Sequence, residues 1–256
     1  MRNPALRQAL AGLFMLVMAS AGVAQSPQPA IAAPFPLPEK LDYRIEWRLI
    51  TAGMATVKLS RSAGNLWETN LKIESAGFVT KLYRVLDTYR ALTNDQFCGV
   101  NTTLDAQEGK RHKYTVLSFD NGRHKVQYEE RDLLKNKSTT KALDVPPCTH
   151  EIVGALSAFR MMRLEPGKSA SIPVTDGKKV AMARVEAQER ETITIDKKDY
   201  HTIRYEAFLF DNVLYQRKGR LWIWMTDDAS RLPVQIRVRL GFPIGNITLF
   251  LDKEEH

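Results

Sequence analysis

The chain has 256 residues, of which 44% are hydrophobic, 26% charged and 9% aromatic. This composition excludes a disordered chain, a collagen-like repeat and a low-complexity filament. Lysine and arginine outnumber aspartate and glutamate by 37 to 29, which gives a formal net charge of +8, and the length is enough for a β domain with a sizeable buried core.

The first 24 residues have the features of a secretory signal peptide. Arg2 and Arg7 form a positive start. The apolar run Ala9–Ala19 is shorter than the about 20 residues that a membrane-spanning helix needs. Gly22-Val23-Ala24 fits a small-x-small cleavage site, and Ala32-Ala33 is a weaker alternative. We therefore expect cleavage near Ala24 and a mature protein that is soluble, periplasmic or secreted, and without a transmembrane span.

A proline-rich segment follows, with the sequence SPQPAIAAPFPLP over residues 26–38. Each proline fixes φ and lacks an N–H group, so the segment can neither pair in a sheet nor continue a helix. We expect a tether over residues 25–40 and a single β-rich exported domain over residues 41–252.

Alternation of apolar and polar residues dominates this domain. In residues 41–49 every odd position is apolar and every even one is charged, which predicts a strand with one dry face. Gly53 suggests a turn or bulge before the next strand, and Asn121-Gly122 is a strong hairpin signal. The remaining strands are expected at residues 55–59, 67–74, 114–119, 125–128, 183–187, 191–195, 201–210, 219–225, 234–240 and 247–251.

Residues 151–163 have helical periodicity instead. Thr149 is a candidate N-cap, Pro166-Gly167 is a stop signal, and a second short helix is expected at residues 79–86. The apolar stripe of the main helix consists of Ile152, Leu156, Phe159 and Met162. The expected fold is mainly β: an antiparallel curved sheet or open half-barrel, with this amphipathic helix packed on its dry face.

Cys98 and Cys148 are the two cysteines of the chain. An even pair in an exported protein predicts a disulfide, which would close a loop of about 50 residues. Neither cysteine belongs to a CxxC motif, and only His150 is near one of them. Two free buried thiols, or a metal or redox pair, are the alternatives.

Two motifs carry a family resemblance. The stretch IVGALSAFRMMRLEPGKSASIP begins at Ile152; Glu151 stands near an acidic position of the family pattern and Arg160 at its arginine. The stretch LWIWMTDDASRLP contains the pattern W-x-T-D-D-x-x-R-x-P, formed here by Trp224, Thr226, Asp227, Asp228, Arg231 and Pro233. Together they resemble the exported bacterial domain-of-unknown-function family 3108 over nearly all of residues 41–251. The resemblance implies an envelope location and a mainly β fold, without a settled activity.

The second motif also predicts a structural role from its residues alone. Asp227 or Asp228 can accept backbone N–H groups in the turn, and we expect Arg231 to pair with one of these carboxylates. Pro233 is tolerated at the start of the return strand. The order of strand, polar turn and return strand is similar to lipoprotein-carrier half-barrels of the bacterial periplasm, which hold acyl chains.

No catalytic constellation stands out. Adjacent carboxylates in one turn do not face each other across a substrate, as a glycosidase requires. The five histidines form no zinc-binding motif, and the chain lacks a nucleophile elbow and a phosphate-binding glycine loop. We therefore assign no catalytic residue, no metal site and no cofactor.

Aromatic side chains are the candidate ligand-binding residues: Trp47, Trp222, Trp224 and Phe159. The segment from Leu221 to Met225 is apolar on both faces, so one face could meet the helix while the other lines a cavity. An ordinary two-layer core is the alternative.

Basic residues cluster at residues 110–113, 123–125 and 135–137. For an exported protein, anionic phospholipid or lipopolysaccharide is a better-matched partner than nucleic acid. The alternative is that these charges simply occupy the wet face of the sheet.

Two functions stay open. The first is a non-enzymatic periplasmic protein that binds or scaffolds an envelope component, with a lipid or acyl chain favoured over an envelope protein partner. The second is an envelope glycan- or lipid-acting hydrolase that uses Asp227, Asp228 or Glu151 as acid–base groups.

Overall fold

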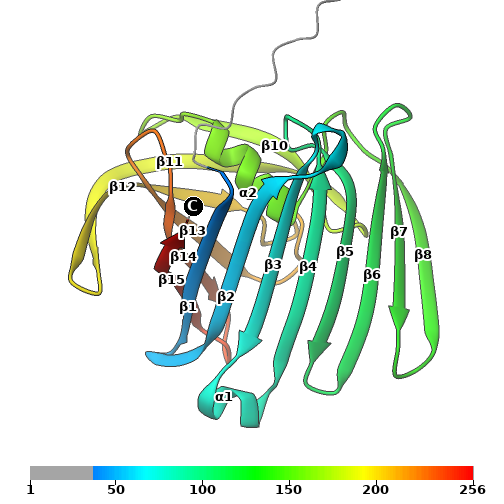
Figure 1. The fold of residues 1–256 in the computed structure, drawn as a ribbon, viewed down its shortest axis with the longest axis horizontal. Helices are drawn as coiled ribbons and strands as arrows, with labels where there is room; N and C mark the ends of the chain where they lie inside the picture. Colours follow the sequence, from blue (N-terminus) through cyan, green and yellow to red (C-terminus); the bar gives the residue numbers. More distant parts are fainter. Residues whose placement is uncertain (1–36, 256) are drawn as a thin grey trace, which may run out of the picture. The chain divides into compact units, whose positions relative to one another are not determined.

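The computed structural model describes residues 37–255, and one fifteen-stranded sheet contains all the strands in that range (Figure 1). The predicted leader and its cleavage sites lie outside the described residues. The first half of the sheet is a series of antiparallel hairpins. Its strands are β1 (Glu39–Trp47), β2 (Ile50–Arg61), β3 (Trp67–Ser75), β4 (Val85–Thr93), β5 (Gly99–Glu108), β6 (Arg111–Asp120), β7 (Lys125–Asp132) and β8 (Lys137–Asp144).

The second half of the sheet continues from β1, because β15 pairs antiparallel with it. The order across the sheet is β8-β7-β6-β5-β4-β3-β2-β1-β15-β14-β13-β12-β11-β10-β9. The additional strands are β9 (His150–Glu151), β10 (Ser169–Thr175), β11 (Val180–Ile195), β12 (Lys198–Phe208), β13 (Gly219–Thr226), β14 (Pro233–Leu240) and β15 (Asn246–Glu255). The predicted class, a mainly β, antiparallel open sheet, is confirmed.

Helices are few within the described range: α1 (Gly77–Leu82), α2 (Ile152–Met161) and a short 3-10 turn (Ala63–Asn65). The main predicted helix is confirmed as α2, but its N-cap is Glu151. The predicted cap, Thr149, instead donates its hydroxyl to the Pro146 carbonyl. The helix expected at residues 79–86 overlaps α1, although Val85 already begins β4.

Gly53 does not form a turn. The chain turns at Arg48 and Leu49, and Gly53 lies inside β2 beside a register shift, so the predicted bulge is present and the predicted turn is wrong. A Cβ at Gly53 would collide with the Glu74 carbonyl of β3, which explains why a glycine stands there.

Helix α2 packs its apolar stripe on the sheet, as predicted. Phe159 is 2% exposed and lies in a cluster with buried residues of β11, β12 and β13, against which Leu156 and Met162 also pack. Phe159 meets the Tyr205 ring edge-on, with ring centroids 4.8 Å apart. Ile152 packs against a neighbouring cluster that contains Ile172 and Val174 of β10.

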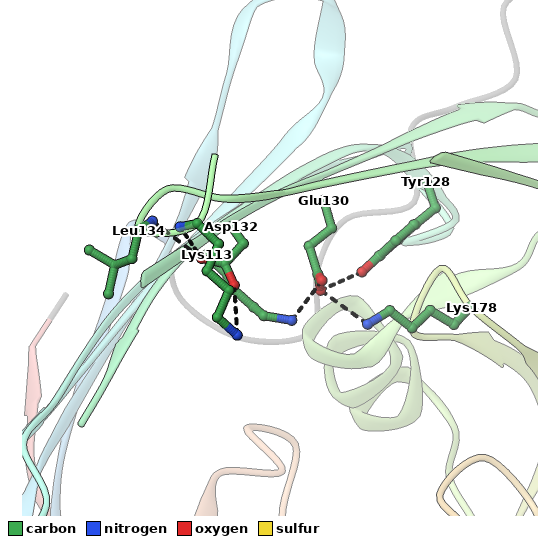
Figure 2. A network of polar contacts seen from close by, with 7 residues as sticks. Lys113, Tyr128, Glu130, Asp132, Leu134 and Lys178 are labelled. Carbon is green, nitrogen blue, oxygen red and sulfur yellow. Dashed lines mark hydrogen bonds and ion pairs between the residues drawn. The ribbon is translucent and has the colours of Figure 1, made fainter. Parts of the chain in front are cut away.

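Side chains link β6 and β7 to the turn between β10 and β11. Glu130 of β7 accepts hydrogen bonds from Lys113 (2.7 Å), Tyr128 (2.6 Å) and Lys178 (3.0 Å), and Lys178 belongs to that turn (Figure 2). Burial alone would raise the pKa of Glu130, but these donors lower it to about 2. Polar contacts, in place of strand pairing, therefore link strands near one edge of the sheet to a turn near the other edge.

The predicted disulfide between Cys98 and Cys148 is present, with the two Cα atoms 4.7 Å apart. It ties the connection between β4 and β5 to the segment that leads into α2. We expect no alkylation of the purified protein under denaturing, non-reducing conditions and two alkylated thiols after reduction, measured by intact mass. Two reactive thiols before reduction would contradict the pairing.

Candidate functional site

A cavity of about 240 Å³ lies between α2 and the sheet. An apolar cavity of about 150 Å³ already accepts benzene, so this volume is sufficient for a small apolar group. Strands β1, β2, β3 and β10 to β15 contribute its walls together with α2. Its lining is mostly aliphatic and includes Val57, Leu71, Ile73, Leu156, Leu221, Ile236 and Leu249.

Many of these lining side chains are only half-buried, although they face inward. Leu71 and Ile73 of β3 and Ile236 of β14 are examples. Apolar surface that protein atoms leave uncovered is unfavourable in water, at about 25 cal/mol per Å². Binding of an apolar ligand in the cavity would therefore be favourable in free energy, because the ligand would cover this apolar surface and remove it from water.

A buried ion pair forms one wall of the cavity. Arg160 of α2 donates from both terminal nitrogens to the Glu39 carboxylate, at 2.6 and 2.8 Å, and each side chain is less than 5% exposed. Arg160 also donates to the carbonyls of Arg231 and Ser230, both at 3.1 Å. These four hydrogen bonds indicate that Arg160, the arginine of the first motif, has a structural role: it joins α2 to β1 and to the connection between β13 and β14.

Arg231, the arginine of the second motif, contacts the same helix. Its Nε donates to the Arg160 carbonyl at 2.7 Å, and its Nη1 donates to the Tyr205 hydroxyl at 3.2 Å. The two arginines thus each donate to the other's backbone carbonyl, which joins α2 to the connection between β13 and β14.

The expected side-chain pairing of Arg231 with Asp227 or Asp228 is wrong. Asp228 accepts from Thr226, from Ser230 and from the backbone N–H of Arg231, and Asp227 pairs with Arg190 at 2.7 Å. These donors already occupy both carboxylates, while the buried Arg231 side chain donates to other groups, the Arg160 carbonyl and the Tyr205 hydroxyl. Pro233 begins β14, as predicted, and its carbonyl accepts the Tyr43 hydroxyl at 2.8 Å.

Replacement of Arg231 by alanine should lower the free energy of unfolding by about 2 kcal/mol, because hydrogen bonds from a buried charged group are lost. Urea denaturation measures the change. Arg190→Ala is the matched control, since its side chain is half exposed and its ion pairs lie at the surface. Equal stability of the two variants would contradict a structural role for Arg231.

Glu151 caps α2 from a fully buried position. Its carboxylate accepts the N–H groups of Val153 (2.6 Å) and Gly154, and the Tyr89 hydroxyl at 2.5 Å. Burial raises the pKa of Glu151, although these three donors oppose the shift. A Cβ at Gly154 would collide with this carboxylate, so the cap and the glycine of the first motif require each other.

Replacement of Glu151 by alanine should therefore cost about 2–3 kcal/mol of unfolding free energy, because the helix cap is lost and the Tyr89 hydroxyl is left without its acceptor. Glu151→Gln keeps one acceptor oxygen and should cost less. Thermal and urea unfolding at neutral pH measure both. Identical losses for the two variants would show that the oxygen kept by Glu151→Gln contributes nothing, which would contradict this account of the cap.

The three carboxylates considered for hydrolysis are thus engaged in structural contacts: Glu151 in the helix cap, Asp228 in the turn and Asp227 with Arg190. Among residues 37–255, no group of three or more histidine, cysteine, aspartate or glutamate side chains is arranged to hold a metal ion. In the same range, neither α-helix has the length and apolar run of a membrane-crossing helix.

The tryptophans predicted to bind ligand do not line the cavity, whereas Phe159 does. Trp222 and Trp224 alternate with Leu221 and Ile223, which face the cavity, so both indole rings lie on the other face of β13. Trp224 donates to Glu191 at 2.8 Å.

Trp47 is also outside the cavity lining, since its Nε1 donates to the Ile244 carbonyl at 2.7 Å. Sequence reasoning missed the aliphatic residues that do line it, such as Val57 and Leu71. Their alternating pattern was visible in the sequence, but that pattern is the same for a filled core and for a cavity wall.

The fold and site define a class of protein: an open antiparallel β half-barrel with one helix on its inner face and an apolar cavity beneath that helix. A family model described as "Protein of unknown function (DUF3108)" matches residues 42–252, so the chain belongs to this family. The resemblance drawn from the two motifs is confirmed.

Among solved structures, the chain is similar to a protein from Brucella abortus described as a "Beta-barrel-like Protein of Domain of Unknown Function DUF1849". The TM-score is 0.57 at 11% sequence identity, and the match covers 85% of this chain and 97% of the other. At this identity the likeness shows the fold alone. No curated protein matches the sequence.

Proposed function

We propose that this protein is a non-enzymatic, exported binding protein that holds an acyl chain of an envelope lipid or lipoprotein in the cavity beneath α2. The observation that carries the proposal is the aliphatic cavity of about 240 Å³, whose lining includes half-buried apolar side chains. Such a lining favours apolar groups and has little affinity for sugars or nucleotides.

The charged side chains and the tyrosine at the cavity support the same ligand class, because they bind to other protein groups. Glu39 and Arg160 pair with each other, and the Tyr43 hydroxyl donates to the Pro233 carbonyl. Ligand selection would therefore rest on shape and on apolar contact.

An extracytoplasmic location fits two features of the chain. The disulfide between Cys98 and Cys148 favours an oxidising compartment. The basic and then apolar N-terminal residues have the composition of an export signal. We therefore propose a periplasmic or secreted location, where envelope lipids are within reach.

Titration with a dansyl-labelled fatty acid tests the proposal. Saturable binding to the wild type is expected. Val57→Trp places a large ring in the cavity and should weaken the affinity by at least about tenfold, which corresponds to 1.4 kcal/mol. Lys58→Trp is the matched control, because Lys58 is exposed on the other face of β2, and it should bind like the wild type.

Native mass spectrometry of the protein purified from a bacterial periplasm provides a second readout, in which a retained acyl lipid is expected. Absence of probe binding by the wild type, or equal weakening by Val57→Trp and Lys58→Trp, would overturn the cavity as the binding site.

A further inference from the structure

Exposed apolar side chains gather at one end of the sheet. In Figure 1 the connections β1–β2, β3–β4, β5–β6 and β7–β8 lie at the same end of their strands, and the pairing of β15 with β1 places β14–β15 beside β1–β2. We name these connections, residues 48–50, 77–84, 109–110, 133–136 and 241–245, the α1 rim.

The α1 rim contains most of the large apolar side chains that are exposed among residues 37–255. Leu49 is 94% exposed, Phe242 96%, and Phe78 and Leu134 63% each. By contrast, no large apolar side chain is exposed in the three hairpin connections at the opposite end of β2 to β7, residues 62–66, 94–98 and 121–124. Scattered exposed apolar residues need no explanation, but a one-sided concentration marks an interaction surface.

The α1 rim is also basic. Its five connections contain Arg48, Lys81, Arg84, Lys110 and Lys135, all exposed, and no aspartate or glutamate. This combination of apolar tips and positive charge fits the surface of an anionic bilayer, where apolar side chains enter the acyl boundary and basic ones meet lipid phosphates. Two such rims would repel each other, which disfavours a second copy of the chain as the occupant.

Local bonds hold the apolar tips outward. Trp47 and Arg48 donate to the Ile244 and Pro243 carbonyls, which ties the loop bearing Phe242 to the β1–β2 turn. Asp132, at the border of the rim, accepts the backbone N–H groups of Leu134 and Lys135 and also pairs with the Lys135 ammonium at 3.7 Å, so its carboxylate is used within the turn. Figure 2 shows the Leu134 side chain pointing away from this polar network.

We propose that the α1 rim docks this protein on the surface of a bilayer that contains anionic phospholipid. The surface is made of connections that do not line the cavity, so it stands independently of ligand binding there. Helix α2 lies at the other end of β1, where Arg160 meets Glu39. Docking by the rim would therefore leave α2 away from the membrane.

Co-sedimentation with vesicles tests this proposal. The wild type should sediment with vesicles of phosphatidylethanolamine and phosphatidylglycerol, far less with vesicles of phosphatidylcholine alone, and less at high salt. The triple variant Leu49→Ser, Phe78→Ser, Phe242→Ser should lose at least about tenfold in the partition coefficient, because three apolar insertions are removed. Tyr114→Ser with Met182→Ser is the matched control, since both are exposed apolar side chains outside the rim.

Charge-reversal variants test the basic residues of the α1 rim independently of its apolar residues. Lys81→Glu with Lys135→Glu should reduce binding to anionic vesicles by at least about tenfold, whereas Arg123→Glu with Lys58→Glu, outside the rim, should have little effect. Unchanged melting temperatures show that each variant is folded.

Failure of the wild type to sediment with anionic vesicles, or unchanged sedimentation of both rim variants, would overturn the proposal. So would a loss of dimer mass by the rim variants in sedimentation velocity without any vesicle binding, which would assign the rim to contact between copies. Val57→Trp should bind vesicles like the wild type, so failure of the cavity proposal is distinguishable from failure of this one.

Discussion

Replacement of Glu39 by alanine is expected to lower the free energy of unfolding by about 3–5 kcal/mol, because it leaves the Arg160 guanidinium buried without its carboxylate. The pair joins the first residue of β1 to α2, across 121 positions of the sequence. Loss of the pair should therefore loosen the contact between helix and sheet.

Urea denaturation of Glu39→Ala and of the double variant Glu39→Leu, Arg160→Met measures this effect. The double variant should recover part of the loss, because it removes both buried charges and fills similar volume. Lys40→Ala is the control on the same strand, as Lys40 forms surface pairs with Asp42 and Glu255. A small loss in Glu39→Ala, similar to that of Lys40→Ala, would contradict the structural importance of the pair.

Phe159→Ala is expected to cost about 3–5 kcal/mol as well. The ring is 2% exposed, meets Tyr205 edge-on and packs among residues of three strands. Because the ring also borders the existing cavity, its removal would enlarge an apolar space that the rigid sheet cannot close.

Urea denaturation of Phe159→Ala measures this loss: the midpoint concentration of urea should fall, while the dependence of the unfolding free energy on urea concentration should stay unchanged. Phe242→Ala, which truncates a ring that is 96% exposed, should leave the midpoint where it is. A loss below about 1 kcal/mol in Phe159→Ala would mean that neighbouring side chains collapse into the space, and would argue against a rigid cavity.

Strand prediction succeeded for most strands that have one apolar face, although β10 was missed despite its alternating Ala170, Ile172 and Val174, and β4 was missed because its start lies in the helix expected at residues 79–86. β1 and β14 were visible as alternating runs. β5 was missed, because Thr102 and Asn101 stand where an apolar period would need aliphatic residues. β8 was missed for a related reason: it is the edge strand and nearly all its side chains are exposed, so its sequence has no reason to alternate.

For the candidate site, the sequence placed Phe159 correctly and the tryptophans incorrectly. Both faces of β13 are apolar, so the sequence pattern was compatible with either face lining the cavity: Leu221 and Ile223 on one face, or Trp222 and Trp224 on the other. Their aromatic character favoured the tryptophans as ligand contacts, but the cavity lies on the aliphatic face.

The sequence by itself determined the β class, the main helix, the disulfide and the family, because each depends on local periodicity, on residue counts or on a contiguous motif. Only the tertiary structure decided that Arg160 and Arg231 each donate to the other's backbone carbonyl, and that Glu39 forms the buried ion pair with Arg160. It also decided which face of the sheet is hollow and at which end the exposed apolar tips gather. These features depend on the pairing of β1 with β15 and on the curvature of the sheet, which bring together residues that are far apart in the chain. Alternation along one strand distinguishes its two faces, but it contains no information about what lies opposite either of them.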